Sequence, residues 1–176
     1  MIDTLTITIA EPADAPALKA LLEAAYRGDS ARAGWNHEAD ILDDERIAAH
    51  ELDALLNDRA VTILIARSSR AAGGDNLMGC VAVTRIDNAR GYLGMLCVAP
   101  ALQSGGFGRR LLDAAEDRGR TIGITRMEMT VIDSRESLIT WYERRGYLRT
   151  GETRPFPVAR NPPITFTVLE KPLAPA

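Results

Sequence analysis

The stretch that decides the fold is GMLCVAPALQSGGFGRRLLDAAEDRGR, residues 94–120. Its first part, Met95 to Val98, is apolar and predicts a buried strand. Pro100 ends this strand, because proline lacks the backbone N–H that a sheet ladder requires. The segment QSGGFG at 103–108 then predicts a glycine-rich turn that opens a helix, so strand, turn and helix follow directly on one another.

The predicted helix carries an apolar stripe at Leu111, Leu112 and Ala115, and Gly119 ends it. Its first N–H groups have no intrahelical partner and lie at the positive end of the helix dipole. Glycines let a bulky anion approach that backbone, and Arg109 adds positive charge. A phosphate or pyrophosphate site fits these features, although a tight turn with no ligand accounts for the glycines equally well.

The composition predicts one globular domain over residues 1–176, with 46% hydrophobic and 26% charged residues. A net charge of −3 and a sequence pI near 5.5 argue against general nucleic-acid binding. The sequence shows no long uncharged apolar run and no basic-then-apolar leader. We therefore expect a cytoplasmic protein with no membrane partner.

The two cysteines, Cys80 and Cys97, both lie in apolar, strand-like runs. Buried reduced thiols are the favoured interpretation over a disulfide or a reactive site. His37 and His50 are the only histidines, and no Cys/His spacing is typical of zinc. We expect no metal.

The hydrophobic pattern predicts seven strands and four helices. The strands are expected at 4–10, 61–66, 77–85, 95–98, 125–132, 147–150 and 164–169. The helices are expected at 14–25 with Asp14 as N-cap, at 44–56, at 108–119, and at 134–145 with Ser134 as cap and Gly146 after the end. The four-proline segment 151–163 is predicted to be a loop. Early hairpins followed by a strand–helix–strand unit predict a mixed α/β (α+β) domain around a central sheet.

A polar connection over residues 28–46 holds Trp35 and, after it, five acids. The acids are Glu38, Asp40, Asp43, Asp44 and Glu45. A long loop with an aromatic residue and clustered acids is often functional. The alternative is a solvated loop whose acids serve as N-terminal charges for the next helix.

Two motifs together resemble the GNAT superfamily of N-acetyltransferases. The first is Val98-x-Pro100 followed by Gln103-x-x-Gly106-x-Gly108 and a Leu-Leu pair; the second is WYERRGY at 141–147. The motifs cover residues 92–148, and the element order extends the resemblance over nearly the whole chain. It implies a mostly antiparallel twisted sheet of six to seven strands, about four flanking helices, and fourth and fifth strands splayed at the cofactor site. Many members are dimers, so a homodimer is one expectation.

The resemblance implies that acetyl-CoA is the co-substrate and that its acetyl group passes to a primary amine by direct attack in a ternary complex. The acceptor would be a small molecule, an amino acid or a peptide N-terminus. The main chain of Leu96, Cys97 and Val98 would pair with the pantetheine arm, and one N–H would polarise the thioester carbonyl. Cys97 is then not expected to be a nucleophile. The CoA pyrophosphate would be held by the turn residues Gln103, Ser104, Gly105, Gly106, Phe107, Gly108 and Arg109.

Tyr142 matches the family tyrosine that protonates the departing CoA thiolate; the alternative is that it packs on the apolar face of its helix. Arg135 stands where many members have a cofactor-binding Asn, and it either reaches a CoA phosphate or faces solvent. Thr130 stands where a carboxylate base is often found. Glu128, on the same strand face, is therefore the candidate base, acting through a water, unless it is an ordinary ion-paired carboxylate.

The acceptor is expected to lie against residues 26–45, the turn near Asp87 and the loop 151–163. Trp35 and Phe156 would form apolar walls, while Glu38, Asp40 and Asp43 would attract a cationic amine. Two other functions stay open. One is a non-catalytic acyl-CoA-binding module of the same fold, and the other is a nucleotide-binding domain, which the absence of Gly-Lys-Ser/Thr after the glycines argues against.

Overall fold

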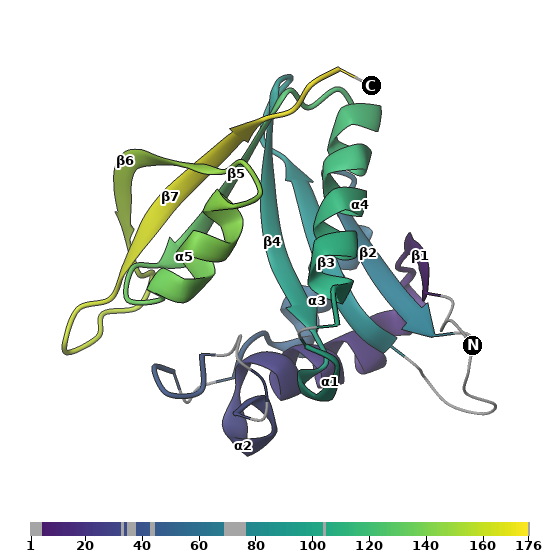
Figure 1. Ribbon diagram of the computed structural model, residues 1–176. Helices are drawn as coiled ribbons and strands as arrows, with labels where there is room; N and C mark the ends of the chain where they lie inside the picture. Colours follow the sequence, from purple (N-terminus) through teal and green to yellow (C-terminus); the bar gives the residue numbers. More distant parts are fainter. Residues whose placement is uncertain are drawn as a thin grey trace.

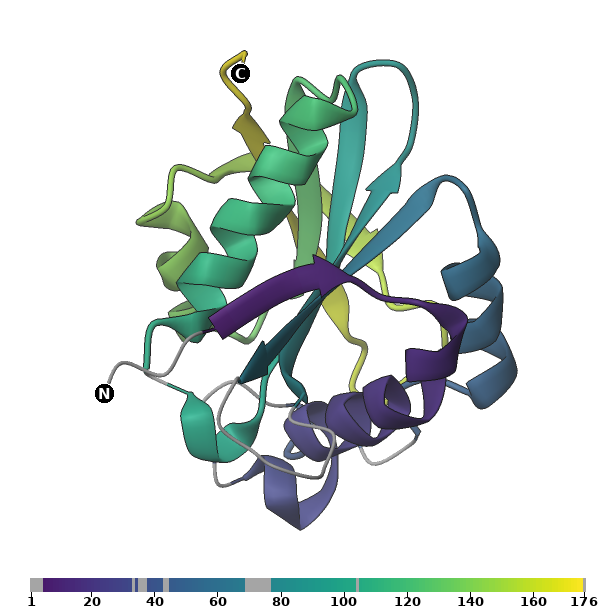
Figure 2. The same ribbon diagram turned by 90° about the vertical axis from the view of Figure 1, so that its right-hand side faces the viewer.

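The computed structural model describes residues 5–32, 34, 38–42, 45–68, 77–103 and 105–175. Seven strands form one sheet in the order β1-β2-β3-β4-β5-β7-β6 (Figures 1 and 2). The strands are β1 Leu5–Ile9, β2 Val61–Ser68, β3 Leu77–Arg85, β4 Arg90–Val98, β5 Arg126–Ile132, β6 Leu148–Pro155 and β7 Thr165–Pro172. The mixed α/β architecture predicted from the sequence is confirmed.

Helices cover both faces of the sheet. On one face α1 (Ala15–Tyr26) and α3 (Ala49–Asn57) share a core cluster with Ile63, Ile65 and Cys97. On the other, α4 (Phe107–Thr121) and α5 (Glu136–Glu143) share a second cluster with strand residues such as Val81 and Leu96. A short helix, α2 (Gly28–Ala31), follows α1, and 3-10 turns occur at Pro12–Asp14 and Pro100–Leu102.

Strands β4 and β5 are parallel neighbours only at their beginnings. Their pairing runs from Arg90 opposite Arg126 to Tyr92 opposite Glu128, whereas β4 continues to Val98. All other neighbouring strands are antiparallel. Figure 1 shows β5, β7 and α5 turning away from β4. The predicted splay is confirmed, and it opens the sheet beside the second half of β4.

A β-bulge shifts the alternation of β4 inside this opened region. Cys80 lies opposite Cys97 but Ala82 lies opposite Gly94, so β4 holds one more residue than β3 between these pairs. Met95 has a φ of 55°, an uncommon value for a residue with a side chain. Because of the bulge, Leu93 and Leu96 both belong to the cluster under α4 although they are three positions apart.

One predicted helix start was wrong, and one predicted N-cap residue, Asp14, stands at its predicted position without a side-chain cap. The helix expected from residue 44 begins at Ala49, because the backbone N–H groups of Arg46 and Ile47 donate to Glu23 Oε1 on α1 instead of forming a helical turn. Asp44 itself lies outside the described residues. Asp14 does not cap α1 with its side chain, because its carboxylate accepts from Glu11 N and from Arg67.

Two further boundaries differ from the prediction. Arg135, not Ser134, is the residue before α5, and no side-chain cap forms there. The segment expected to be a loop from Gly151 belongs to β6 as far as Pro155, where it pairs with Thr165 at the edge of the sheet. Proline is tolerated there because an edge strand leaves one side of its backbone unpaired.

Candidate active site

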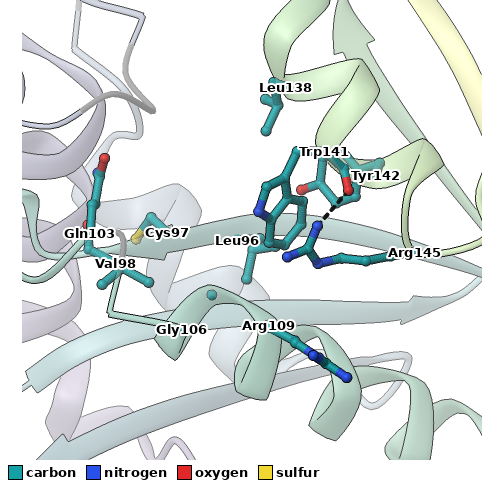
Figure 3. A pocket seen from close by; sticks show the side chains of 11 residues that line it. Leu96, Cys97, Val98, Gln103, Gly106, Arg109, Leu138, Trp141, Tyr142 and Arg145 are labelled. Atoms are coloured by element: carbon teal, nitrogen blue, oxygen red, sulfur yellow. Dashed lines mark hydrogen bonds between the residues drawn. The ribbon is translucent and has the colours of Figure 1, made fainter.

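Two cavities meet beside the splay, and Leu96, Leu138 and Tyr142 line both of them. The first cavity has a volume of about 300 Å³ and lies among the end of β4, the start of α4 and α5 (Figure 3). The second cavity, about 580 Å³, is bordered by α1, the segment after it, and the loop that follows β6. The lining residues of the first cavity are Leu96, Cys97, Val98, Gln103, Gly106, Gly108, Arg109, Leu138, Trp141, Tyr142 and Arg145.

The glycine turn forms one wall of the first cavity. Gly106 precedes α4 with a φ of 80°, a left-handed conformation that favours glycine. No described atom lies within 4 Å of the position where its Cβ would stand. The first N–H groups of α4 are therefore reachable by a ligand anion from this side.

Arg145 forms the opposite wall, together with Trp141 (Figure 3). Its guanidinium lies 3.6 Å from the centre of the Trp141 ring and donates from Nη1 to the Trp141 carbonyl at 2.7 Å. Its Nε is buried and has no hydrogen-bond partner among the described residues. Burial, and then the positive charge of Arg109, lower the pKa of Arg145. An anion bound between Arg109 and Arg145 would relieve both effects.

The bulge of β4 is held from the α1 face. The Tyr26 hydroxyl donates to the Leu96 carbonyl, and the Cys80 thiol lies 3.3 Å from the Met95 carbonyl. The thiols of Cys80 and Cys97 are buried, free and 3.6 Å apart. The hydrogen bond with Cys97 and burial raise the pKa of Cys80. These contacts fix the backbone that faces both cavities, and the expectation of buried, reduced cysteines holds.

Tyr142 is buried at the junction of the cavities. Its ring packs edge-on against Trp141 at 4.9 Å and against Tyr147 at 5.7 Å between centroids. Burial raises the pKa of the Tyr142 phenol, and the charge of Arg135 opposes that shift. The phenol therefore stays protonated at neutral pH and is available as a proton donor.

Most of the predicted cofactor residues lie together. Leu96, Cys97, Val98, Gln103, Gly106, Gly108 and Arg109 line the first cavity. Gly105 and Phe107 belong to the same turn without lining it, and Phe107 packs on the core instead. Ser104 lies outside the described residues. Arg135 lines the second cavity rather than the first, with a side chain only 10% exposed.

Glu128, the candidate base, is engaged by an arginine. It is buried on β5, and its carboxylate accepts from Arg154 Nη1 on β6 at 2.7 Å. Glu128 is not one of the described residues that line either cavity. The structure thus matches the ion-paired alternative and gives no support to a role as base.

Some of the predicted acceptor residues line the second cavity, and others do not. Glu38 lines the second cavity, and so does Phe156, whose ring lies 5.4 Å from that of Phe166. Asp40 does not line it; its side chain is 70% exposed and pairs with Arg32 at 3.0 Å. Trp35 and Asp43 lie outside the described residues.

Sequence reasoning missed Trp141 and Arg145 as lining residues and Arg46 in the second cavity. Trp141 and Arg145 are four positions apart in the WYERRGY motif, so their shared face was a readable signal. Arg46 gave no signal, because its position depends on the contact of its backbone with Glu23 on α1.

Within the described ranges, no helix is long and apolar enough to cross a bilayer. The same part of the chain holds no group of three or more His, Cys, Asp and Glu side chains that could bind a metal ion.

Comparisons with known proteins agree with this fold. Residues 17–147 match the family model described as the acetyltransferase (GNAT) family. The chain belongs to the GNAT acetyltransferase family.

Individual relatives are more distant. The amino-acid acetyltransferase of Neisseria meningitidis is 36% identical over 78 residues, which are 44% of this chain and 17% of that protein. An IAA acetyltransferase of Azospirillum brasilense is 27% identical over 150 residues, 84% of each chain. An acetyltransferase of Salmonella typhimurium, solved with acetyl-CoA, superposes with a TM-score of 0.69 at 18% identity, covering 98% of this chain and 96% of its own. The chain thus spans less than a fifth of the length of the Neisseria relative.

Proposed function

We propose that residues 1–176 act as one acetyl-CoA-dependent N-acetyltransferase domain whose acceptor is a primary amine. The observation that carries this proposal is the position of Tyr142, which lines both cavities. A proton donor at such a junction can reach a leaving thiolate on one side while the acceptor approaches from the other. The amino-acid acetyltransferase among the relatives supports an amine acceptor.

The first cavity fits acetyl-CoA. Gly106 leaves space at the start of α4, and Arg109 and Arg145 bring two positive charges to the same cavity. The buried Nε of Arg145 has a donor to offer to a phosphate oxygen. Bound there, acetyl-CoA supplies an activated acetyl thioester. The turn and the two arginines hold its pyrophosphate, and the Leu96–Val98 backbone lies along its pantetheine arm.

The chain's own groups then act on the reacting atoms. A backbone N–H at the bulge donates to the thioester carbonyl oxygen, and this bond strengthens as negative charge develops on that oxygen. Tyr26 and Cys80 keep the bulge in place through its carbonyls. Tyr142, whose phenol is neutral at pH 7 at its ordinary pKa and stays so when burial raises that pKa, gives its proton to the departing sulfur.

The amine loses its proton through water rather than to Glu128, which Arg154 already engages. Tyr92 and Thr130 provide hydroxyls that can order such a water, because both line the second cavity and their oxygens are 2.7 Å apart. Thr130 thus occupies the position of the usual carboxylate without replacing its chemistry.

We also propose a cytoplasmic location, on the basis of the two free, buried thiols.

A non-catalytic acyl-CoA-binding module is the second candidate function. The deciding experiment is a thiol-release assay with acetyl-CoA over amino acids, polyamines, aminoglycosides and short peptides. We expect amine-dependent release of CoA and an acetylated product by mass spectrometry. Acetyl-CoA binding without release for any amine would favour the binding module instead.

A further inference from the structure

The second cavity contains a group of apolar side chains that the two core clusters do not use. Ile132, Phe156, Val158 and Phe166 all line this cavity, and we call these four residues the apolar wall. As far as the described residues show, none of the four belongs to the cluster under α4 and α5 or to the cluster under α1 and α3. Apolar side chains that line a cavity outside the core are typical contacts of the apolar part of a ligand.

The alternation of β5 directs the wall toward the cavity. Met129 and Val131 belong to the cluster that contains α5, so Thr130 and Ile132 lie on the opposite face of the strand. Ile132 is the direct partner of Phe166 on β7, and paired residues of antiparallel strands share a face. The wall therefore lies on the face of β5 and β7 that α5 does not cover.

The two aromatic rings of the wall are held in place by contacts within the protein. The Phe156 N–H donates to the Ile164 carbonyl at 3.0 Å, which ties the loop after β6 to the residue before β7. The Phe156 ring lies 5.4 Å from the Phe166 ring, and the Arg160 guanidinium lies 5.6 Å from the Phe156 centroid. A surface that is already ordered loses little side-chain entropy when a ligand binds to it.

Val158 leaves part of this wall in contact with water. It is 57% exposed, and among the large exposed hydrophobic residues of the described ranges it alone lines one of the two cavities. An apolar group bound beside Val158 would remove that surface from water, which favours binding.

The wall begins close to the groups that act on the amine. The Thr130 hydroxyl lies 2.7 Å from that of Tyr92, where the proposed mechanism orders the water that takes the amine proton. Ile132 is the next residue on the same face of β5, about 7 Å further along the strand. An amine of the length of n-pentylamine or 2-phenylethylamine can span this distance, with its nitrogen near Thr130 and its far end on the wall.

We propose that the acceptor is a primary amine that carries an apolar group, a ring or an alkyl chain, and that Phe156 and Phe166 determine this specificity. The inference rests on the proposed acetyltransferase function and narrows its substrate class. The amine nitrogen lies near Thr130 and Tyr142, and the apolar group covers the wall. Polyamines are disfavoured, because a second ammonium group would lose water against four side chains that offer no hydrogen-bond acceptor.

The test compares amines of equal length that differ in the polarity of the far end. The first pair is n-pentylamine and 4-aminobutan-1-ol, in which a hydroxyl replaces the terminal methyl group. The second pair is 2-phenylethylamine and 2-(imidazol-4-yl)ethylamine, and spermidine is the cationic probe. Each amine is assayed by thiol release at saturating acetyl-CoA. We expect kcat/KM of the apolar member to exceed that of the polar member by at least about tenfold in each pair.

Variants of the two phenylalanines assign the preference to the wall. Phe156→Ala and Phe166→Ala are each expected to lose at least about tenfold in kcat/KM for n-pentylamine and much less for 4-aminobutan-1-ol, so that their ratio collapses. Phe156→Leu, which keeps an apolar side chain, should recover part of the ratio. Leu148→Ala is the matched control, because Leu148 is a 68% exposed residue of β6 that lines neither cavity. Equal melting shifts on acetyl-CoA addition show that each variant is folded.

The outcomes separate the two proposals. Turnover of the polar amines or of spermidine equal to or better than that of the apolar amines overturns the inference while the acetyltransferase function stands. A preference for apolar amines that survives both Phe156→Ala and Phe166→Ala overturns the role of the wall. Absence of thiol release with every amine counts against the proposed function and against the inference that rests on it.

Discussion

Gly106 is the residue that leaves the N–H groups at the start of α4 accessible to an anion. We expect Gly106→Ala to weaken acetyl-CoA binding by about tenfold, because its Cβ narrows the approach to the α4 N–H groups. The strain of a Cβ at a φ of 80°, about 1–2 kcal/mol, lowers the free energy of unfolding instead. Isothermal titration with acetyl-CoA measures the change.

Gly123→Ala is its matched control. Gly123 has a φ of 83° and equally open space, but it follows α4 and lines neither cavity described above. The two variants should lose similar stability, and only Gly106→Ala should lose affinity. Equal affinity in both would remove the turn from the anion site.

Cys97 lies where an acyl acceptor would have to be, yet its chemistry is wrong for one. Its thiol is buried and lies 3.6 Å from the Cys80 thiol, so it is enclosed by the core rather than presented to a ligand. Incubation with acetyl-CoA in the absence of amine should therefore leave the protein's mass unchanged by intact mass spectrometry. An acetyl adduct mapped to Cys97 would contradict direct transfer.

At the scale of elements, a buried ionic cluster joins α4 to β7 near the end of the sheet where β4 and β5 are still paired. Lys171 Nζ donates to both carboxylate oxygens of Glu116 at 2.8 Å, and the Tyr147 hydroxyl donates to Oε1 at 3.2 Å. We expect Glu116→Gln to lower the free energy of unfolding by about 3 kcal/mol, because it leaves the ammonium of Lys171 without its charge partner. Urea denaturation measures this loss.

Asp117→Asn provides the comparison for that variant, since Asp117 is the next residue on α4 and its side chain is 76% exposed. Its removal should change stability by no more than about 0.5 kcal/mol. If both variants unfold at the same urea concentration, the cluster does not hold α4 and β7 together.

The elements themselves could largely be predicted from the sequence, because local patterns encode them. The alternation over β5 and the glycine at the end of α5 are local signals, and both elements lie where they were expected. The predicted element boundaries were wrong where a contact with a distant segment determines the boundary. Glu23 takes the N–H groups that would have started α3 early, and β7 draws Thr153–Pro155 into β6.

The same distinction between local patterns and distant contacts applies to the residues of the site. The glycine turn and Tyr142 lie within contiguous motifs, so the sequence located them. Arg46 and the pairing of Glu128 with Arg154 depend on contacts between segments far apart in the chain. For that reason the sequence did not show that Glu38, one of the acids of the polar connection, lies between Arg27 and Arg135 in the folded cavity.

At the scale of the whole molecule, buried acids of high pKa set the alkaline limit of stability. Burial is the main cause that raises the pKa of Tyr26, Tyr142 and Tyr147, and a hydrogen bond with Cys97 followed by burial raises that of Cys80. In the unfolded chain these groups ionise near pH 8.5 for the thiol and about 10 for the phenols. The unfolded state therefore releases protons first as the pH rises.

The free energy of unfolding should be constant up to about pH 8.5 and then fall. The fall is about 1.4 kcal/mol per pH unit for each group that is ionised in the unfolded chain but still protonated in the folded protein. Urea midpoints between pH 7 and 11 test this, and Tyr147→Phe, which removes a buried phenol outside both cavities, should make the fall less steep. A midpoint that stays constant to pH 11 would contradict the assignment.

At the scale of the whole molecule, two cavities meet beside the splay, and the buried phenol of Tyr142 lines both of them. The most direct test of this account is the kinetics of Tyr142→Phe, which removes one oxygen and keeps the ring packing against Trp141 and Tyr147. We predict a fall in kcat of roughly 100-fold with an acetyl-CoA dissociation constant within about twofold of wild type. An unchanged kcat, or a loss confined to acetyl-CoA affinity, would contradict the role of Tyr142 as the proton donor.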